Sequence, residues 1–136
     1  RILLCYSNFH FATYSTFGND REKAINEIPK NLMVFEKKRL PRNQCYLQMS
    51  KYCFIVSPHG IGMDTIRMWE ALILGCIVIV KTSPLDSLYK DLPVLIVQKW
   101  SDVTEKLLKE TVIDFSNKTF MYEKLTLKYW IDKIHN

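Results

Sequence analysis

The sequence lacks any apolar run that approaches the roughly 18 residues a membrane-spanning helix needs, so we expect no membrane span in this chain. It shows no secretory signal peptide, no internal repeat and no low-complexity segment, and only four of its 136 residues are glycine. These absences exclude fibrous, repeat-built and linker-like chains. What remains, with 48% hydrophobic and 24% charged residues, is typical of a single globular domain over 1–136.

Several site motifs are also missing. The four cysteines show no C-x-x-C spacing, and Cys5, Cys53 and Cys76 lie in or beside apolar runs, so we expect free thiols and neither a zinc site nor a disulfide framework. The absence of G-x-x-x-x-G-K-[ST] excludes a P-loop. No Asp-x-Asp pair is present to hold a metal-bound diphosphate. We therefore expect no metal and no cofactor.

Positive charge is in excess, with a formal net charge of +5, which suits an anionic partner without choosing one. The nineteen Lys and Arg residues are scattered along the chain. Their densest cluster, EKKRLPR at 36–42, is typical of a solvated turn. We expect no nucleic-acid partner.

Short apolar runs alternate with stretches of helical spacing. Strands are predicted at 1–7, 31–36, 53–58, 76–80 and 93–97. Helices are predicted from Asn19 or Asp20 to Pro29, at 41–52, at 65–75, within 83–92, at 101–110 after a Ser-x-x-Thr cap, and at 120–134. Because the central strands lack polar alternation, they belong in a parallel sheet with helices on both faces. The sequence therefore predicts a three-layer, Rossmann-like α/β fold.

The turn SPHGIGMDT joins a predicted strand to a predicted helix. Its Gly60 and Gly62, with Ile61 between them, allow a ligand to approach the main chain closely. Ligands of such sheets bind at the carboxyl ends of the strands, and the start of a helix attracts phosphate. A tight turn that merely requires glycine explains the same residues, so the turn alone leaves both interpretations open.

The helix after this turn carries charge on one face. At about 100° per residue, Asp64, Arg67 and Glu70 fall within roughly a third of the circumference. Asp64 or Thr65 can cap its start, Gly75 suits its end, and Ile66, Trp69 and Ile73 recur on one side. Since most of the helix is apolar, we expect it to be buried, with its charged face toward a cleft or a partner. A carboxylate there can accept hydrogen bonds from the two vicinal hydroxyls of a ribose.

These residues resemble a known family. CFIVSPHGIGMDTIRMWEALILGCIVIV, followed by SPLDSLYKDLPVLIV, looks like the donor-binding half of an exostosin-like glycosyltransferase of the two-domain GT-B type. The similarity covers about 53–97, with a looser echo in STFGNDREKAI. Val78 departs from the family's pattern, which often has proline there. The resemblance implies transfer of a sugar from a nucleoside-diphosphate sugar to a glycan or another hydroxyl acceptor.

Residue by residue, the resemblance implies that Glu70 binds the donor's ribose and that the 60–62 turn admits its diphosphate or sugar. Arg67 would hold the helix and the anionic group, and Arg21 would be a second diphosphate contact. Asp64 and His59, at the two ends of the turn, are also predicted to bind the donor. A lone histidine beside such a turn is, however, more typical of a hydrogen-bonded structural residue than of a catalytic one. The resemblance implies that the general base would come from an amino-terminal domain. We expect that domain to be missing here, because the chain begins at Arg1 without an initiator methionine. That missing part would also determine whether the protein is located in the cytoplasm or in the Golgi lumen.

Two alternatives remain at this stage. One is a noncatalytic α/β module that binds a nucleotide or a protein. The other is an S-adenosylmethionine or nicotinamide enzyme of the same broad fold. Against a nicotinamide enzyme, Thr65 replaces the third glycine of G-x-G-x-x-G, and the next strand ends at Lys81 without an acidic residue. Against an S-adenosylmethionine enzyme, the loop after the first strand is poor in glycine, although Glu36 suits the acidic end of the second strand.

Overall fold

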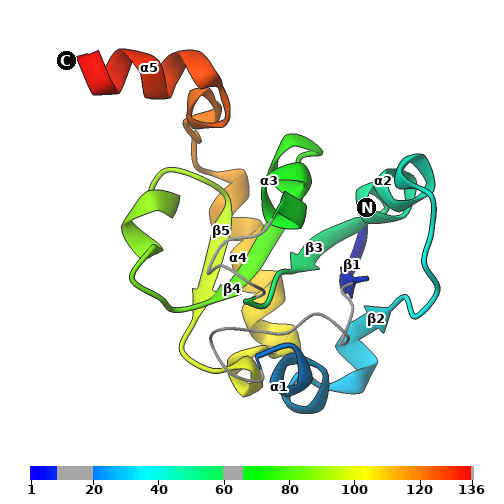
Figure 1. Cartoon of the computed structure of the whole chain (residues 1–136). Helices are drawn as coiled ribbons and strands as arrows, with labels where there is room; N and C mark the ends of the chain where they lie inside the picture. The colour runs from blue at the N-terminus through cyan, green and yellow to red at the C-terminus, as the bar shows by residue number, and fades with distance from the viewer. Residues whose placement is uncertain (9–19, 60–65, 136) are drawn as a thin grey trace.

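The structure, a computed structural model, describes residues 1–8, 20–59 and 66–135. Its centre is a five-stranded sheet, all parallel, in the order β2-β1-β3-β4-β5 (Figure 1). The strands are β1 (Ile2–Ser7), β2 (Met33–Phe35), β3 (Tyr52–Val56), β4 (Ile77–Lys81) and β5 (Val94–Val97). The α-helices are α1 (Asp20–Glu27), α2 (Arg42–Ser50), α3 (Ile66–Ile73), α4 (Glu105–Ser116) and α5 (Leu127–His135). Short 3-10 helices are η1 (Lys30–Leu32), η2 (Asp86–Tyr89), η3 (Trp100–Asp102) and η4 (Tyr122–Leu125).

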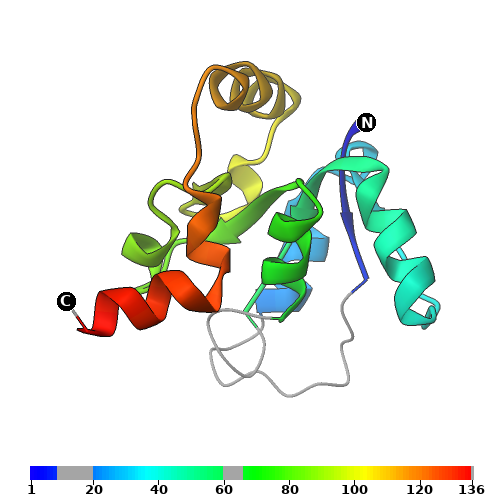
Figure 2. The same cartoon turned by 90° about the horizontal axis from the view of Figure 1, so that it is seen from above.

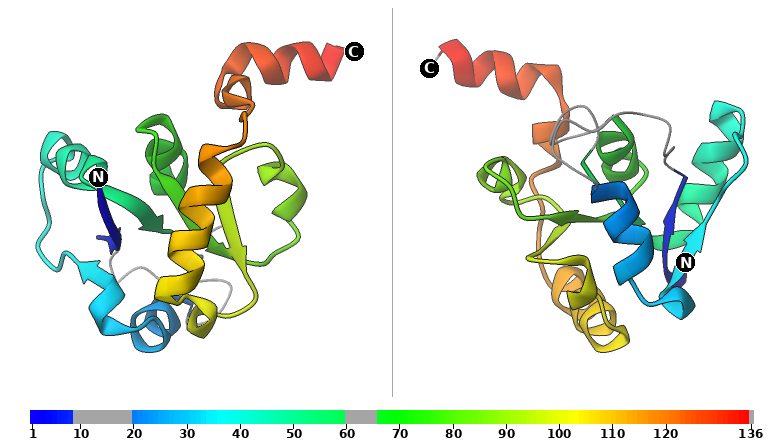
Figure 3. Two further views of the ribbon diagram at one scale, coloured as in Figure 1. Left: turned by 180° about the vertical axis from the view of Figure 1, so that it is seen from behind. Right: turned by 60° about the horizontal axis from the view of Figure 1, so that its bottom comes forward.

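Helices cover both faces of the sheet, which confirms the predicted three-layer α/β fold (Figures 2 and 3). One face packs on α1, α4 and η3 around Phe54, Ile79 and the fully buried Trp100. The other packs on α2, α3 and η2 around Ile55 and Val78. Successive side chains of β3 therefore pack into the cores on opposite faces of the sheet, which is why that strand is apolar throughout.

Chain connections leave β1 and β3 in opposite directions. From β1 the chain passes through α1 to the outer strand β2, and from β3 it passes through α3 to β4 on the other side. Because such crossovers are right-handed, α1 and α3 lie on opposite faces of the sheet. The strand order reverses between β1 and β3, and this switch point is where open α/β sheets bind ligands.

The burial of α3 differs from the prediction. Met68, Ala71 and Leu72 form its buried stripe, whereas Ile66 and Ile73 are 76% and 68% exposed. The expectation of a buried helix is therefore right for only one of its faces. The apolar residues at 66, 69 and 73 share a face, as predicted. The helix contacts the sheet through a different face, however, which is formed by the buried residues at 68, 71 and 72.

Two helix boundaries also differ. The predicted helix at 101–110 begins four residues later, because the Thr104 hydroxyl accepts a hydrogen bond from the Leu107 amide (3.1 Å) and is the N-cap of α4. The predicted last helix is divided into η4 and α5 by Thr126, whose backbone is extended. The Trp130 indole donates to the Lys124 carbonyl (2.7 Å) across this break. Figure 1 shows α5 projecting away from the sheet.

All four cysteines are free thiols, as predicted. Burial raises the pKa of Cys5, which is fully enclosed beneath α1 and α4, to about 12 from an ordinary 9.0. Since the folded-state pKa is the higher one, this thiol's contribution to stability is complete below pH 9 and is lost as the pH rises toward 12.

We expect the free energy of unfolding to fall by about 1.4 kcal/mol per pH unit from Cys5 alone above pH 9. Urea unfolding at pH 8, 9 and 10 measures this slope. Cys5→Ala should flatten it by that amount, even though the variant is less stable at neutral pH because it leaves a cavity. An unchanged slope in Cys5→Ala would contradict the assignment.

Candidate functional site

The switch point is formed by the segments that leave β1 and β3. The Ser7 hydroxyl donates to the Val56 carbonyl (2.8 Å) and joins the carboxyl ends of the two strands. Asn8 follows β1, and the buried Ser57, Pro58 and His59 follow β3. The edge of the sheet is therefore held together where these two chains diverge.

Arg67, in the first turn of α3, reaches across this point. Its Nε donates to the Asn8 side-chain oxygen (2.7 Å), and a terminal nitrogen lies 3.5 Å from the Asn8 carbonyl. The guanidinium is thus fixed above the end of β1, with α3 supplying its position and Asn8 its orientation.

Positive charge concentrates around this guanidinium. Burial lowers the pKa of Arg67, and the positive charge of Arg21 on α1 lowers it further, while Glu70 opposes the shift. Burial also lowers the pKa of Arg21. The positive charges of Arg21 and Arg67, which come from helices on opposite faces of the sheet, therefore oppose each other, and the negative charge of Glu70 acts in the other direction. A bound anion would remove the repulsion.

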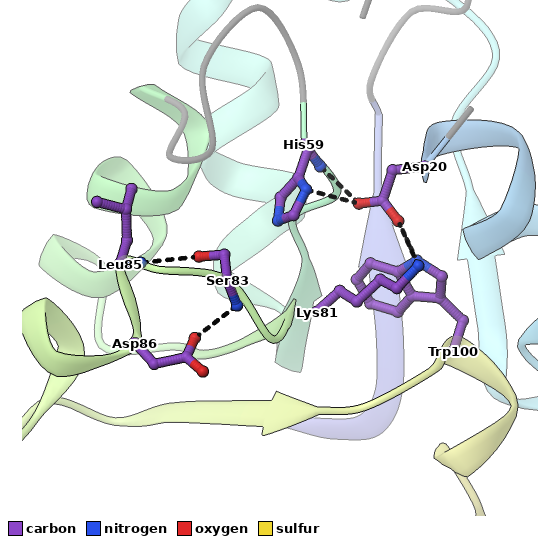
Figure 4. Close-up of polar contacts among 7 residues, drawn as sticks. All are labelled: Asp20, His59, Lys81, Ser83, Leu85, Asp86 and Trp100. Carbon is purple, nitrogen blue, oxygen red and sulfur yellow. Dashed lines mark hydrogen bonds and ion pairs between the residues drawn. The ribbon is translucent and has the colours of Figure 1, made fainter. Parts of the chain in front are cut away.

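Next to this pair, the carboxylate of Asp20 joins four segments of the chain (Figure 4). It is 3% exposed at the start of α1. One oxygen accepts from the Trp100 indole (2.7 Å), and the other accepts from the His59 backbone amide (2.8 Å). Lys81 Nζ lies 4.0 Å and His59 Nδ1 3.8 Å from the same carboxylate. Asp20 therefore fixes the segment that leads from β3 into the glycine turn.

The structure brings together three of the predicted site residues. Arg67 and Glu70 are three residues apart on α3, and the positive charge of Arg21 adds to the effect of burial in lowering the pKa of Arg67. His59 is buried, and its backbone amide donates to the carboxylate of Asp20. Its predicted part in donor binding stays a prediction. Gly60, Ile61, Gly62 and Asp64 lie outside the described residues.

Sequence reasoning missed two members of this region. Asp20 was predicted only as a helix cap, and Asn8 was not singled out at all. An aspartate at the start of a helix is so common as a cap that no local pattern indicates its contacts 39 and 80 residues away. Lys81 was noted only as a strand end that lacked an acid.

Within residues 1–8, 20–59 and 66–135, no three His, Cys, Asp or Glu side chains gather as a metal site would require. No helix in the same ranges has the length and apolarity to cross a membrane. No protein-family model matches the chain, and a search of curated proteins found no match either.

Proposed function

We propose that this chain is the donor-binding domain of a GT-B glycosyltransferase, which uses a nucleoside-diphosphate sugar to glycosylate a hydroxyl acceptor. The observation that carries the proposal is the guanidinium group of Arg67, held by Asn8 at the switch point of a parallel sheet, on which the positive charge of Arg21 also acts. An arginine pair is costly in a half-buried place unless an anion occupies it, and guanidinium groups fit phosphate oxygens with two parallel hydrogen bonds.

The same pair suits the chemistry of sugar transfer. As the bond between the sugar and the diphosphate breaks, negative charge grows on the leaving phosphate oxygens. Two fixed cations stabilise that charge more strongly than the charge of the intact donor, so they lower the barrier and do not merely tighten binding. Asn8 holds Arg67 in place beforehand, which avoids reorganisation during the reaction.

Glu70 supplies the contact for the nucleoside. Glu70 is half-buried on α3, three residues after Arg67. Because successive residues of a helix are about 100° apart, both side chains lie on one side of α3. The two carboxylate oxygens of Glu70 can accept from the 2′ and 3′ hydroxyls of a ribose while Arg67 faces the phosphates. This arrangement distinguishes a ribonucleoside diphosphate from bare pyrophosphate.

We expect Glu70→Gln to weaken binding of UDP or GDP by about tenfold, because one acceptor of the hydroxyl pair becomes a donor and the charge is lost. Affinity for inorganic pyrophosphate should stay the same or rise. Isothermal titration of the full chain with UDP, GDP, their sugars and pyrophosphate measures both effects. Glu110→Gln, on the exposed face of α4, is the matched control.

The proposal fails if NAD or S-adenosylmethionine binds while nucleotide-sugars do not. It also fails if Glu70→Gln leaves the affinities for UDP and GDP unchanged. Binding of nucleotides without preference for their sugars would favour the noncatalytic nucleotide-binding module.

A further inference from the structure

A polar cleft lies between the ends of β3 and β4, next to the switch point. Figure 4 shows Asp20, His59, Lys81 and Ser83 of its lining. Its volume is about 260 Å³. Its lining comes from α1, from the segment after β3 and from the turn after β4: Asp20, Lys23, His59, Lys81, Thr82, Ser83 and Pro84. The cleft shares the end of β3 with the switch point, but its lining includes neither Arg67 nor Glu70 of the proposed donor site.

Negative charge in this cleft is already compensated. The carboxylate of Asp20 accepts two short hydrogen bonds, one at each oxygen, from the Trp100 indole and from the His59 amide. Lys81 Nζ, with its side chain 30% exposed, lies at 4.0 Å, beyond hydrogen-bonding distance. Among the described residues this ammonium makes no hydrogen bond, so its three N–H groups remain available to a ligand. Lys23 adds a second, exposed ammonium at the rim.

The turn after β4 presents a hydroxyl with a fixed orientation. The carboxylate of Asp86 accepts from the Thr82 hydroxyl and, at 3.0 Å, from the Ser83 amide, which makes the turn rigid. Ser83 Oγ accepts from the Leu85 amide (3.1 Å), as Figure 4 shows. An oxygen that accepts in this way still carries its own proton, and within the described part of the chain Ser83 donates that proton to no residue.

We propose that this cleft is a second oxyanion site, which binds the phosphate of a phosphate monoester through Lys23, Lys81 and Ser83. Donors from three segments surround a tetrahedral group better than a flat carboxylate, which fits two parallel donors. The volume also leaves room for part of the molecule that carries the phosphate. The site does not depend on the proposed function, because its lining includes none of Arg21, Arg67 and Glu70, although both sites lie at the end of β3.

Titration of the full chain with inorganic phosphate, followed by the backbone amide resonances of Lys81, Thr82 and Ser83, tests this site directly. We expect these amides to shift in a saturable manner. Ser83→Ala should weaken phosphate binding there by about tenfold, and Lys23→Gln by about threefold. Both changes leave the contacts of Asp20 intact, so the variants should fold. Lys81→Met should abolish the site, and Lys51→Gln, an exposed lysine before β3 at the opposite edge of the sheet, should have no effect.

Three results would overturn the site: no shift at 81–83, equal shifts with acetate at the same ionic strength, or equal weakening by Lys51→Gln. The outcomes also separate the two proposals. Glu70→Gln should leave phosphate binding at 81–83 unchanged. If the unsubstituted protein shows these shifts but binds no nucleotide or nucleotide-sugar, the result counts against the donor site alone.

Discussion

Asp20→Asn is expected to lower the free energy of unfolding by about 2–4 kcal/mol, although it changes only one atom of the side chain. Both carboxylate oxygens accept from N–H groups, the Trp100 indole on one side and the His59 amide on the other. An asparagine has one oxygen and one NH2 group, so in either orientation its NH2 must face a donor. One buried N–H group is then left without an acceptor, and Lys81 loses the charge beside it.

Urea unfolding with a common denaturant slope measures this loss. The control is Asp114→Asn, which removes an exposed ion pair between Asp114 on α4 and Lys118. Its free energy of unfolding should stay within about 0.5 kcal/mol of that of the original protein. The double variant Asp20→Asn with Trp100→Phe is the sharper test, because the NH2 group can then turn toward the side that has lost its donor. We expect the two changes to cost at least about 1 kcal/mol less together than their sum. Strict additivity would show that the carboxylate does not join these segments.

The fold could be predicted from sequence because its signals are local. The runs CFIVS, CIVIV and PVLIV are apolar on both faces, and only a sheet covered on both sides accommodates them; they became β3, β4 and β5. Gly75 was placed correctly at the end of α3, where its φ of 84° suits glycine. The buried face of α3 could not be predicted from the sequence, because Ile66 and Ile73 are as apolar as Met68 and Leu72. Packing on the sheet chose between the two stripes.

The site could be predicted only in part for the same reason. Arg67 and Glu70 share a helix face, which helical periodicity gives directly. The approach of Arg21 to Arg67 depends on right-handed crossovers that place α1 and α3 at one switch point, so it needed the strand order. The role of Asp20 depends on partners at 59 and 100, contributed by two different strand ends. No spacing of residues in the sequence predicts that these side chains come into contact.

Arg21→Gln is expected to weaken pyrophosphate and UDP binding by about 10- to 30-fold while leaving the unliganded protein as stable as before or about 0.5 kcal/mol more stable. The two effects have opposite signs for one reason. Without an anion, the positive charge of Arg21 opposes that of Arg67 and adds to the effect of burial, which is the larger cause of the lowered pKa of Arg67. With an anion between them, both guanidinium groups donate to it. A residue retained only for folding would lose stability and affinity together.

Calorimetric titration at low and physiological salt, beside urea unfolding without ligand, separates these contributions. Arg42→Gln, an exposed arginine at the start of α2, is the matched control and should change neither quantity. The weakening by Arg21→Gln should shrink as salt is raised, because part of it is the attraction of a half-exposed charge. Unchanged pyrophosphate affinity with a loss of stability above 1 kcal/mol would assign Arg21 to the scaffold, and the arginine pair could then no longer support a diphosphate at the switch point.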